Sequence, residues 1–379
     1  MKICVGLSGG VDSSVAALLL KQQGYDVFAM FMQNWHDADA TLHGDCEWEE
    51  DRFVAELVAR KIGIPFYFVD LSKEYRQRVV DYMFNEYSAG RTPNPDVLCN
   101  REIKFDAFLK AARKLGADMV ATGHYCRRAP LLDADGKQVV IEGVPQWRIL
   151  EGVDPNKDQS YFLYMLGQRA LEKAMFPVGG LTKAQVREIA RDAGLTTCAK
   201  KDSTGVCFIG ERRFKPFLEQ FLPAQPGEMQ TLSGRVVGRH DGLMYYTLGQ
   251  RRGLGIGGVA GEEGGGRWFV LAKDMARNVL IVEPGGDHPL LYSRSVEGEG
   301  ATWIAGEPPA HAFDCACKYR YRQPDQQVHV EVAQGGRVLV TAKERQRAVT
   351  PGQSMVLYDG DVCLGGAVAD RVLDAGQEA

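Results

Sequence analysis

Two of the nine cysteines stand in segments whose composition is typical of functional loops. Cys99 lies within residues 92–100 and Cys207 within residues 202–210, and these segments are rich in Gly, Pro, Asp and Asn, so we expect both cysteines in loops. A thiolate is a strong nucleophile, but it needs a lowered pKa or a nearby base to form. Asp96 lies three residues before Cys99 and is a candidate proton acceptor. Only the fold can bring the two distant cysteines together.

A glycine-rich turn near the N-terminus has the residue types that bind phosphate. Gly9 and Gly10 lack a Cβ, so the backbone can curl and direct several N–H groups toward one anion. A helix that starts near Ser13 would add the positive end of its dipole, and the hydroxyls of Ser8 and Ser13 could donate further hydrogen bonds. The turn reads Gly6-Leu7-Ser8-Gly9-Gly10-Val11-Asp12-Ser13.

Other interpretations of this turn are open. Residues 6–10 also match the Gly-x-Ser-x-Gly elbow of hydrolases, but that elbow follows several strands and this turn follows the first. The turn could also be purely structural. It has no lysine of the Walker A type and no Gly-x-Gly-x-x-Gly pattern, so neither an ordinary P-loop nor a dinucleotide site is indicated.

The first half of the chain alternates between strand and helix patterns. Such repeated units predict a parallel sheet covered by helices, with ligands at the carboxyl ends of the strands. A hairpin turn is expected at Asp135-Gly136, and Thr182 is the expected N-cap of the helix that follows it. The expected strands are 2–7, 26–32, 65–69 and 119–122, and the expected helices are 13–23, 49–61, 71–87, 101–115, 183–193 and 212–221.

The residue pattern of the second half changes after Pro226. Short strand patterns alternate with glycine-rich turns, which indicates small β-barrels. We therefore predict an α/β chain with an N-terminal parallel-sheet domain, a small central mostly-β domain and a C-terminal β-barrel. The predicted domains are 1–215, 216–285 and 286–379.

Composition excludes several classes of protein. The nine cysteines are scattered and form no Cys-x-x-Cys pair, which argues against a disulfide scaffold and a zinc finger. No apolar run is long enough to span a bilayer, and polar residues interrupt any signal peptide, so we expect a cytoplasmic protein without membrane contact. The net charge of -4 neither predicts nor excludes binding to nucleic acid, because the local surface decides.

The turn Ser-Gly-Gly-x-Asp-Ser resembles the signature of the PP-loop ATP pyrophosphatases, which split ATP into AMP and pyrophosphate and activate an oxygen as its adenylate. Other segments narrow the resemblance to the tRNA-specific 2-thiouridylase family (MnmA/TrmU), from residue 2 to about residue 370. The segments that carry it are 31–35, 92–100, 121–125, 157–161 and 202–210.

The resemblance implies an activity and a set of site residues. The enzyme would adenylate the C2 oxygen of the wobble uridine of a tRNA, and sulfur would then displace AMP. Cys207 would carry the sulfur as a persulfide, and Cys99 would be its catalytic partner. ATP would be held by the turn from Gly6 to Ser13 together with Met32 and Gly123. The target base would contact Asn94, Pro95 and Asp96. The tRNA would contact His124, Lys157, Asp158, Gln159, Arg320, Tyr321 and Gln353.

Cofactors and partners follow from this chemistry. ATP and Mg²⁺ are expected, with a persulfide on Cys207. Asp96, Cys99 and Cys207 could instead ligate an iron–sulfur cluster, and the sequence does not separate the two schemes. The expected partners are tRNAs for Lys, Glu and Gln and a sulfur donor such as a cysteine desulfurase or a relay protein, and a monomer is favoured.

Residues 318–323 interleave basic and aromatic side chains, which suits contact with phosphates and unpaired bases. The alternative for this run is a solvated strand face. Two other functions remain: a PP-loop enzyme that ligates a small molecule, and an RNA-binding protein with an inactive nucleotide site. The first would need neither motif cysteine, and the intact Ser8, Asp12 and Ser13 argue against the second.

Overall fold

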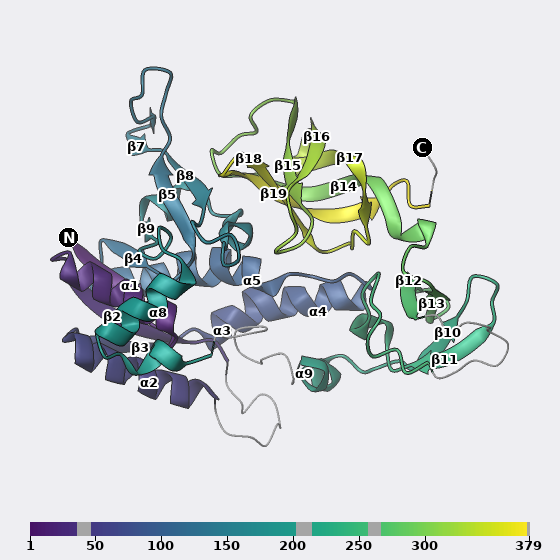
Figure 1. Cartoon of the computed structure of the whole chain (residues 1–379), viewed down its shortest axis with the longest axis horizontal. Helices are drawn as coiled ribbons and strands as arrows, with labels where there is room; N and C mark the ends of the chain where they lie inside the picture. The colour runs from purple at the N-terminus through teal and green to yellow at the C-terminus, as the bar shows by residue number, and fades with distance from the viewer. Residues whose placement is uncertain (36–46, 202–213, 257–266, 377–379) are drawn as a thin grey trace.

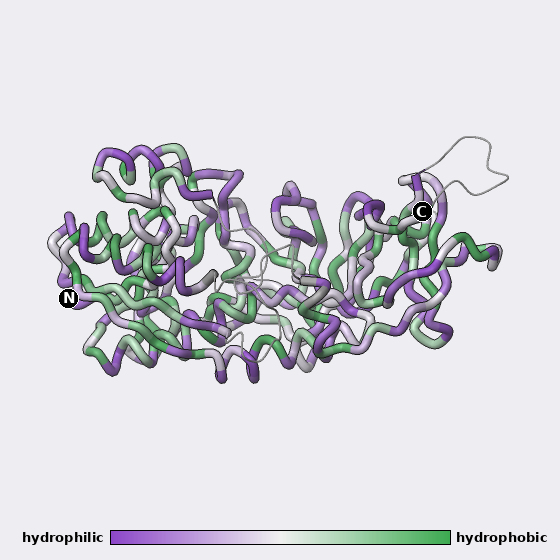
Figure 2. The backbone as a smooth tube through the Cα atoms, turned by 90° about the horizontal axis from the view of Figure 1, so that it is seen from below, coloured by the Kyte–Doolittle hydropathy of each residue, from purple (hydrophilic) through white to green (hydrophobic). Residues whose placement is uncertain are grey.

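The computed structural model describes residues 1–35, 47–201, 214–256 and 267–376. Figure 1 shows a parallel sheet with its helices at the N-terminal end, a barrel at the C-terminal end and a small sheet below the barrel. Figure 2 shows hydrophobic segments inside these parts and hydrophilic ones along many of the outer turns, as burial of apolar surface requires.

The N-terminal sheet has the order β3-β2-β1-β4-β9 in the described residues, and every pairing is parallel. The chain moves from β1 to β2 on one side and reaches β4 on the other. The carboxyl ends of β1 and β4 therefore flank the point where the strand order reverses, the usual ligand site of such sheets. The strands are β1 (Lys2–Gly6), β2 (Asp26–Gln33), β3 (Phe66–Asp70), β4 (Met119–Ala121) and β9 (Ala174–Met175).

Side chains of this sheet alternate between two apolar cores. In β1, Cys4 faces a core beneath helices α4 to α6, whereas Ile3 and Val5 face a core beneath α1, α2 and α8. This is the period of two expected for a strand buried on both faces. The helices are α1 (Val11–Gln22), α2 (Glu47–Ile62), α3 (Ser72–Tyr75), α4 (Asp81–Ser88), α5 (Pro95–Leu98), α6 (Phe108–Lys114), α7 (Gln168–Glu172), α8 (Lys183–Asp192) and α9 (Phe214–Phe221), with π-helical segments η2 (Arg76–Val80) and η3 (Cys99–Ala107).

The expectation that Cys99 lies in a loop is wrong. Helix α5 begins at Pro95 and passes through η3 into α6, so Cys99 is the first residue of the π-helical segment η3. A proline at the first helical position and Asp96 in the first turn both favour a helix start here. The predicted helix over 101–115 therefore begins earlier in the chain.

The C-terminal strands form a closed six-stranded barrel in the order β14-β17-β16-β15-β18-β19, closed by the pairing of β14 with β19. Its sheet continues into β8 and β5, because Ile149 pairs with Cys363 and Leu150 with Val362. Strands from the first half thus extend the last sheet. These strands are β5 (Cys126–Pro130), β8 (Trp147–Glu151), β14 (Tyr292–Trp303), β15 (Ala312–Lys318), β16 (Gln326–Ala333), β17 (Arg337–Arg347), β18 (Ser354–Asp359) and β19 (Val362–Val372).

The strands between these two parts form a small sheet with the order β11-β10-β13-β12. The predicted architecture of a parallel-sheet α/β part, a small β part and a barrel is therefore confirmed. No helix in the described ranges is long and apolar enough to cross a membrane. The remaining strands are β6 (Val140–Ile141), β7 (Val144–Pro145), β10 (Gly227–Gln230), β11 (Val236–His240), β12 (Trp268–Asp274) and β13 (Val279–Pro284).

Candidate functional site

The predicted nucleotide residues gather at the carboxyl edge of the parallel sheet. The glycine-rich turn follows β1, Met32 lies near the end of β2, and Gly123 follows β4. Gly123 touches the turn so closely that a Cβ would lie 2.6 Å from the backbone nitrogen of Ser13. The sequence therefore needs glycine at this position for the two segments to meet.

The turn itself has the geometry of an anion site. Gly9 has a φ of +75°, and a Cβ there would lie 2.4 Å from the carbonyl oxygen of Asp51. Helix α1 begins at Val11. Gly10 is its N-cap residue and has no side chain that could fill the end of the helix. The hydroxyls of Ser8 and Ser13 lie 3.2 Å apart. The first N–H groups of a long helix and two hydroxyls thus face the same place, which suits phosphate oxygens.

Lysines reach this turn from a distant segment. The Lys183 ammonium donates to both carboxylate oxygens of Asp12, at 2.8 Å each, and the Tyr125 hydroxyl donates to one of them at 2.6 Å. Lys200 donates to the carbonyl oxygen of Gly9 at 3.2 Å and to the Asp51 carboxylate. The sequence prediction missed both lysines because the turn's own motif contains none.

The local sequence gives one signal for Lys183. Thr182 is the predicted N-cap of α8, and it forms a complete capping box with Gln185, which places Lys183 in the first helical position. That start lies a few residues after β9, a strand of the same parallel sheet. A lysine at a helix start opposes the helix dipole, and this unfavourable position is a hint of another role.

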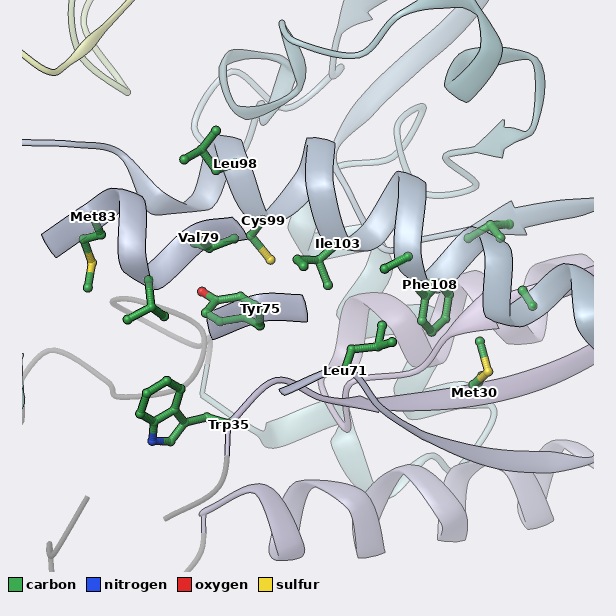
Figure 3. Close-up of a cluster of buried hydrophobic side chains, with 14 of the residues drawn as sticks. Met30, Trp35, Leu71, Tyr75, Val79, Met83, Leu98, Cys99, Ile103 and Phe108 are labelled. Carbon is green, nitrogen blue, oxygen red and sulfur yellow. The ribbon is translucent and has the colours of Figure 1, made fainter. Parts of the chain in front are cut away.

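The predicted catalytic residues Asp96 and Cys99 lie in one segment of the chain. This segment packs on the face of the sheet opposite to the face that α1 covers. Asn94 is the extended residue before α5, Pro95 is buried, and Asp96 is half-buried one helical turn before Cys99. Figure 3 shows Cys99 close to Val79, Tyr75 and Ile103 in the core beneath α4 to α6. Cys99 is fully buried.

The same core reaches the nucleotide side. Met32 packs against it, and Phe108 of the same continuous helix lies beside Gly6, where a Cβ would be 3.4 Å from its ring. Cys207 and the rest of residues 202–210 lie outside the described residues. The predicted meeting of Cys99 with Cys207 is therefore a prediction still.

The barrel brings Tyr321 next to the helix that carries Cys99. Its ring lies 4.5 Å from that of Phe162, and the Phe162 carbonyl accepts a hydrogen bond of 3.0 Å from the amide of Asn100. The neighbouring Arg320 is exposed and donates to the carbonyl of Ala348. Tyr321, one of the predicted tRNA residues, thus lies one contact away from the neighbour of Cys99.

The other predicted tRNA residues make contacts within the chain. Gln159 exchanges hydrogen bonds with the backbone of Tyr125, at 2.8 and 3.0 Å. The Tyr125 hydroxyl in turn donates to Asp12 of the glycine-rich turn, called the phosphate turn below. Asp158 is buried and accepts from the backbone N–H groups of Gly152 and Ser160 and from the Ser160 hydroxyl. Lys157 is half-buried. Contact of these side chains with tRNA stays a prediction.

Comparison with known proteins places the whole chain in one family. Family models match three consecutive stretches: a tRNA methyl transferase HUP domain over residues 1–211, a tRNA methyl transferase PRC-barrel domain over 215–284 and an aminomethyltransferase beta-barrel domain over 293–369. The tRNA-specific 2-thiouridylase MnmA of Alkaliphilus oremlandii is 56% identical over 98% of each chain. That of Exiguobacterium sibiricum is 55% identical over 99% of this chain and 95% of its own. The chain belongs to the tRNA-specific 2-thiouridylase family.

In this member of the thiouridylase family, His124 is buried and neutral. Burial, with a smaller contribution from the Lys104 ammonium, holds the pKa of His124 well below its ordinary 6.5. Its Nε2 lies 3.5 Å from Lys104 Nζ and its Nδ1 lies 2.7 Å from the Thr122 hydroxyl. Because an ammonium can only donate, Nε2 accepts and Nδ1–H faces Thr122. His124, the residue after Gly123, therefore orients the Lys104 ammonium. Contact of His124 with tRNA stays a prediction.

Each of the other described cysteines of this thiouridylase packs in or against an apolar core. Cys4, Cys126 and Cys363 are buried, whereas Cys198 is half-buried. Cys315 and Cys317 share the apolar interior of the barrel, and burial raises the pKa of Cys315 to about 12. A thiol with such a pKa is a poor nucleophile at neutral pH.

A metal site is not formed by the described side chains alone, since no group of three His, Cys, Asp or Glu residues among them could hold an ion. The alternative of an iron–sulfur cluster on Asp96, Cys99 and Cys207 involves a residue outside the described ranges. The persulfide and cluster schemes therefore both stay open.

Proposed function

We propose that this chain catalyses ATP-dependent 2-thiolation of the wobble uridine, U34, of tRNA, giving 2-thiouridine, AMP and pyrophosphate. The observation that carries the proposal is the placement of the glycine-rich turn at the carboxyl end of β1 and of the Cys99 helix on one face of the same sheet, in a chain whose relatives are named tRNA-specific 2-thiouridylase. Two family-model descriptions say methyl transferase. The relatives' name is the better guide, because it holds over nearly the whole chain at more than half identity.

The first step is adenylation of the uracil C2 oxygen, which is otherwise a poor leaving group. The turn from Gly6 to Ser13 supports it with backbone N–H groups and two hydroxyls, and Gly123 lets the segment after β4 approach the turn. Mg²⁺, when bound, would neutralise charge on the phosphates, and the hard oxygens of Asp12 are the donors that suit it. Lys183 would then be free to move from Asp12 toward the phosphates.

The second step transfers sulfur. In the persulfide scheme, the Cys99 thiolate attacks the inner sulfur of the Cys207 persulfide, and a disulfide forms between the two cysteines. The outer sulfur leaves as hydrosulfide and attacks C2 of the adenylated uridine, and AMP departs. Asp96, one turn before Cys99, would take the thiol proton. An external thiol must then reduce the disulfide before the next turnover.

Asn94, Pro95 and Asp96 would hold the target uridine, which must leave its stack to reach both ATP and sulfur. Arg320 and Tyr321 of the barrel would contact the anticodon stem or loop. We place domain boundaries near residues 215 and 286 and expect cytoplasmic tRNAs for Lys, Glu and Gln as substrates. A cysteine desulfurase or a relay protein would supply the sulfur.

The test is thiolation in a purified system. The protein, ATP, Mg²⁺, a persulfide donor and a tRNA with U34 should give tRNA-dependent pyrophosphate release and 2-thiouridine, measured by mass spectrometry of the nucleosides. A tRNA with C34 is the matched substrate control. Cys99→Ala and Cys207→Ala should abolish 2-thiouridine, whereas Cys198→Ala, a half-buried cysteine outside the site, should retain it. Wild-type rates in either of the first two variants would contradict the mechanism.

The cluster scheme is tested with the same protein. Anaerobic purification followed by iron analysis and visible absorption should show no stoichiometric iron if the persulfide scheme is right. Bound iron that supports thiolation, and whose removal abolishes it, would replace the persulfide scheme with the cluster scheme.

A further inference from the structure

Residues 90–93, within the connection between α4 and α5, form a junction of all three parts of the chain. Residues 90–93 directly precede Asn94, the first of the predicted target-base residues. Figure 1 shows α4 and α5 between the parallel-sheet part and the barrel, with α4 pointing toward the small sheet. Gly90, Arg91 and Thr92 are each held by different contacts, described below.

Arg91 binds three carboxylates at once. Its guanidinium donates to Glu86 of α4 at 2.8 Å, to Asp370 of β19 at 2.7 Å and to Glu299 of β14 at 2.7 Å. The side chain is only 17% exposed. β14 and β19 are the two strands that close the barrel. The planar, five-donor guanidinium can satisfy three acceptors in fixed directions, which a lysine cannot do.

Thr92 lies directly against the backbone of the barrel. Its N–H donates to the Pro351 carbonyl at 2.9 Å, and its carbonyl accepts from the Gln353 amide at 2.7 Å. A Cβ on Gly352 would lie 2.8 Å from the Thr92 nitrogen, and Gly352 has a φ of +93°. Gly352 is thus required both for its conformation and for the close approach of the two backbones.

The central part holds the first residue of the junction. Lys273 of β12 donates to the carbonyl of Gly90 at 3.0 Å. Met275 lies so close to Gly90 that a Cβ there would be 2.5 Å from the sulfur. The barrel therefore contacts the junction at Arg91 and Thr92, and the central part contacts it at Gly90.

We propose that this junction positions residues 94–96 and Cys99 for catalysis, and that Arg91 is a positioning residue for thiolation. Pro93 and Pro95 restrict the backbone on both sides of Asn94, so a shift at Arg91 passes to Asn94 rather than being absorbed. The barrel thereby serves as the outer support of the base-binding segment as well as a surface for tRNA. The proposal rests on the proposed thiolation of tRNA.

Two pairs of variants test it. Arg91→Gln removes the charge that binds the three carboxylates, and Arg91→Lys keeps the charge without the fork. Gly352→Ala introduces a methyl group against Thr92, whereas Gly360→Ala also has a positive φ, +56°, but no atom within 4 Å of the new methyl. Gly360→Ala is therefore the matched control for backbone strain.

The measurements are the single-turnover rate of 2-thiouridine formation at saturating ATP and tRNA, the affinity for ATP and the melting temperature. Arg91→Gln and Gly352→Ala should slow thiolation by about a hundredfold, the size of effect that a displacement near 1 Å at a reacting group can have. ATP affinity should be unchanged, because the phosphate turn lies across β1. Arg91→Lys should recover part of the rate, and Gly360→Ala should keep the wild-type rate.

A wild-type rate in Arg91→Gln or Gly352→Ala overturns the proposal. So does a loss of ATP affinity in parallel with the rate at an unchanged melting temperature, because the junction would then support the nucleotide site rather than residues 94–96. If Arg91→Gln does not fold, Glu299→Gln removes one of the three carboxylates and should slow thiolation with ATP affinity intact. The wild-type arm separates the two proposals: no thiolation there refutes the proposed function, whereas active wild type with fully active variants refutes only the positioning role.

Discussion

Asp12 lies in the glycine-rich turn, between the two serines whose hydroxyls meet there, and at the start of helix α1. A carboxylate inside an anion-binding turn would repel phosphate, but Lys183 and Tyr125 both donate to it. The Lys183 side chain is only 12% exposed, so its ammonium is oriented rather than mobile. The Lys183 ammonium therefore lies beside the turn, although the turn's own motif contains no lysine.

We predict that Lys183→Met weakens ATP binding by one to two orders of magnitude, because a hydrogen bond to a charged group contributes roughly 1.5–3 kcal/mol. Isothermal titration with ATP and Mg²⁺ measures the effect. Lys173→Met, which removes a lysine paired with the adjacent Glu172, is the control and should leave ATP binding unchanged. Asp12→Asn combined with Lys183→Met separates two roles: full recovery of ATP binding would show that Lys183 only neutralises Asp12 and does not reach the phosphates.

His124 gives a prediction about pH. Its pKa in the folded chain is well below the ordinary 6.5, so below pH 6.5 the unfolded chain takes up a proton that the folded chain does not. The free energy of unfolding should therefore fall as pH drops below about 6.5, by roughly 1.4 kcal/mol per pH unit for this one group. Urea denaturation between pH 5 and 8 measures it.

His124→Asn isolates that contribution, because burial also lowers the pKa of His240 and the wild-type curve contains both histidines. The difference in unfolding free energy between wild type and His124→Asn should change with pH below 6.5 and be constant above it. A difference that is the same at every pH would show that His124 is not buried as a neutral group.

At the scale of elements, local sequence predicted most of the N-terminal part. The expected strand 2–7 and helix 13–23 are observed as β1 (Lys2–Gly6) and α1 (Val11–Gln22), and both follow from an apolar run and two glycines. The N-cap at Thr182 was also predicted correctly. The start of α5 at Pro95 was not, because a stretch rich in proline and asparagine favours a loop as strongly as a helix start. Packing of Val97, Leu98 and Cys99 into the cores decides for the helix.

Pairings between distant elements could not be predicted. The sequence indicates a hairpin around Asp135-Gly136, but nothing local shows that β8 joins β19. That choice depends on the first residues of β19, Val362 and Cys363, which β14 does not pair with, and on which side chains match across them. The residues of the site also fall into a local and a distant group. Motifs predicted the phosphate turn and Gly123, whereas Lys183, Tyr125 and Arg91 make their contacts with residues far away in the chain.

At the scale of the whole molecule, the first part and the barrel share one apolar core. Phe105 and Ile149 of the first half pack in the same cluster as Val356 and Tyr358 of the barrel. An ion pair crosses the same boundary, where Lys318 of β15 donates to Glu151 of β8. Both side chains are mostly buried, and burial raises the pKa of Glu151 even with this partner present.

We expect the two parts to unfold together and Lys318→Met to weaken both. The variant leaves Glu151 as a mostly buried charge without its lysine, which should lower the free energy of unfolding by roughly 3 kcal/mol at neutral pH. The loss should shrink as pH falls, because protonation of Glu151 removes the unpaired charge. Glu151→Gln combined with Lys318→Met should recover part of the stability for the same reason. Urea denaturation followed by tryptophan fluorescence and by circular dichroism measures both points. Two separate transitions in the wild type, or equal losses in the single and double variants, would contradict a shared core held by this pair.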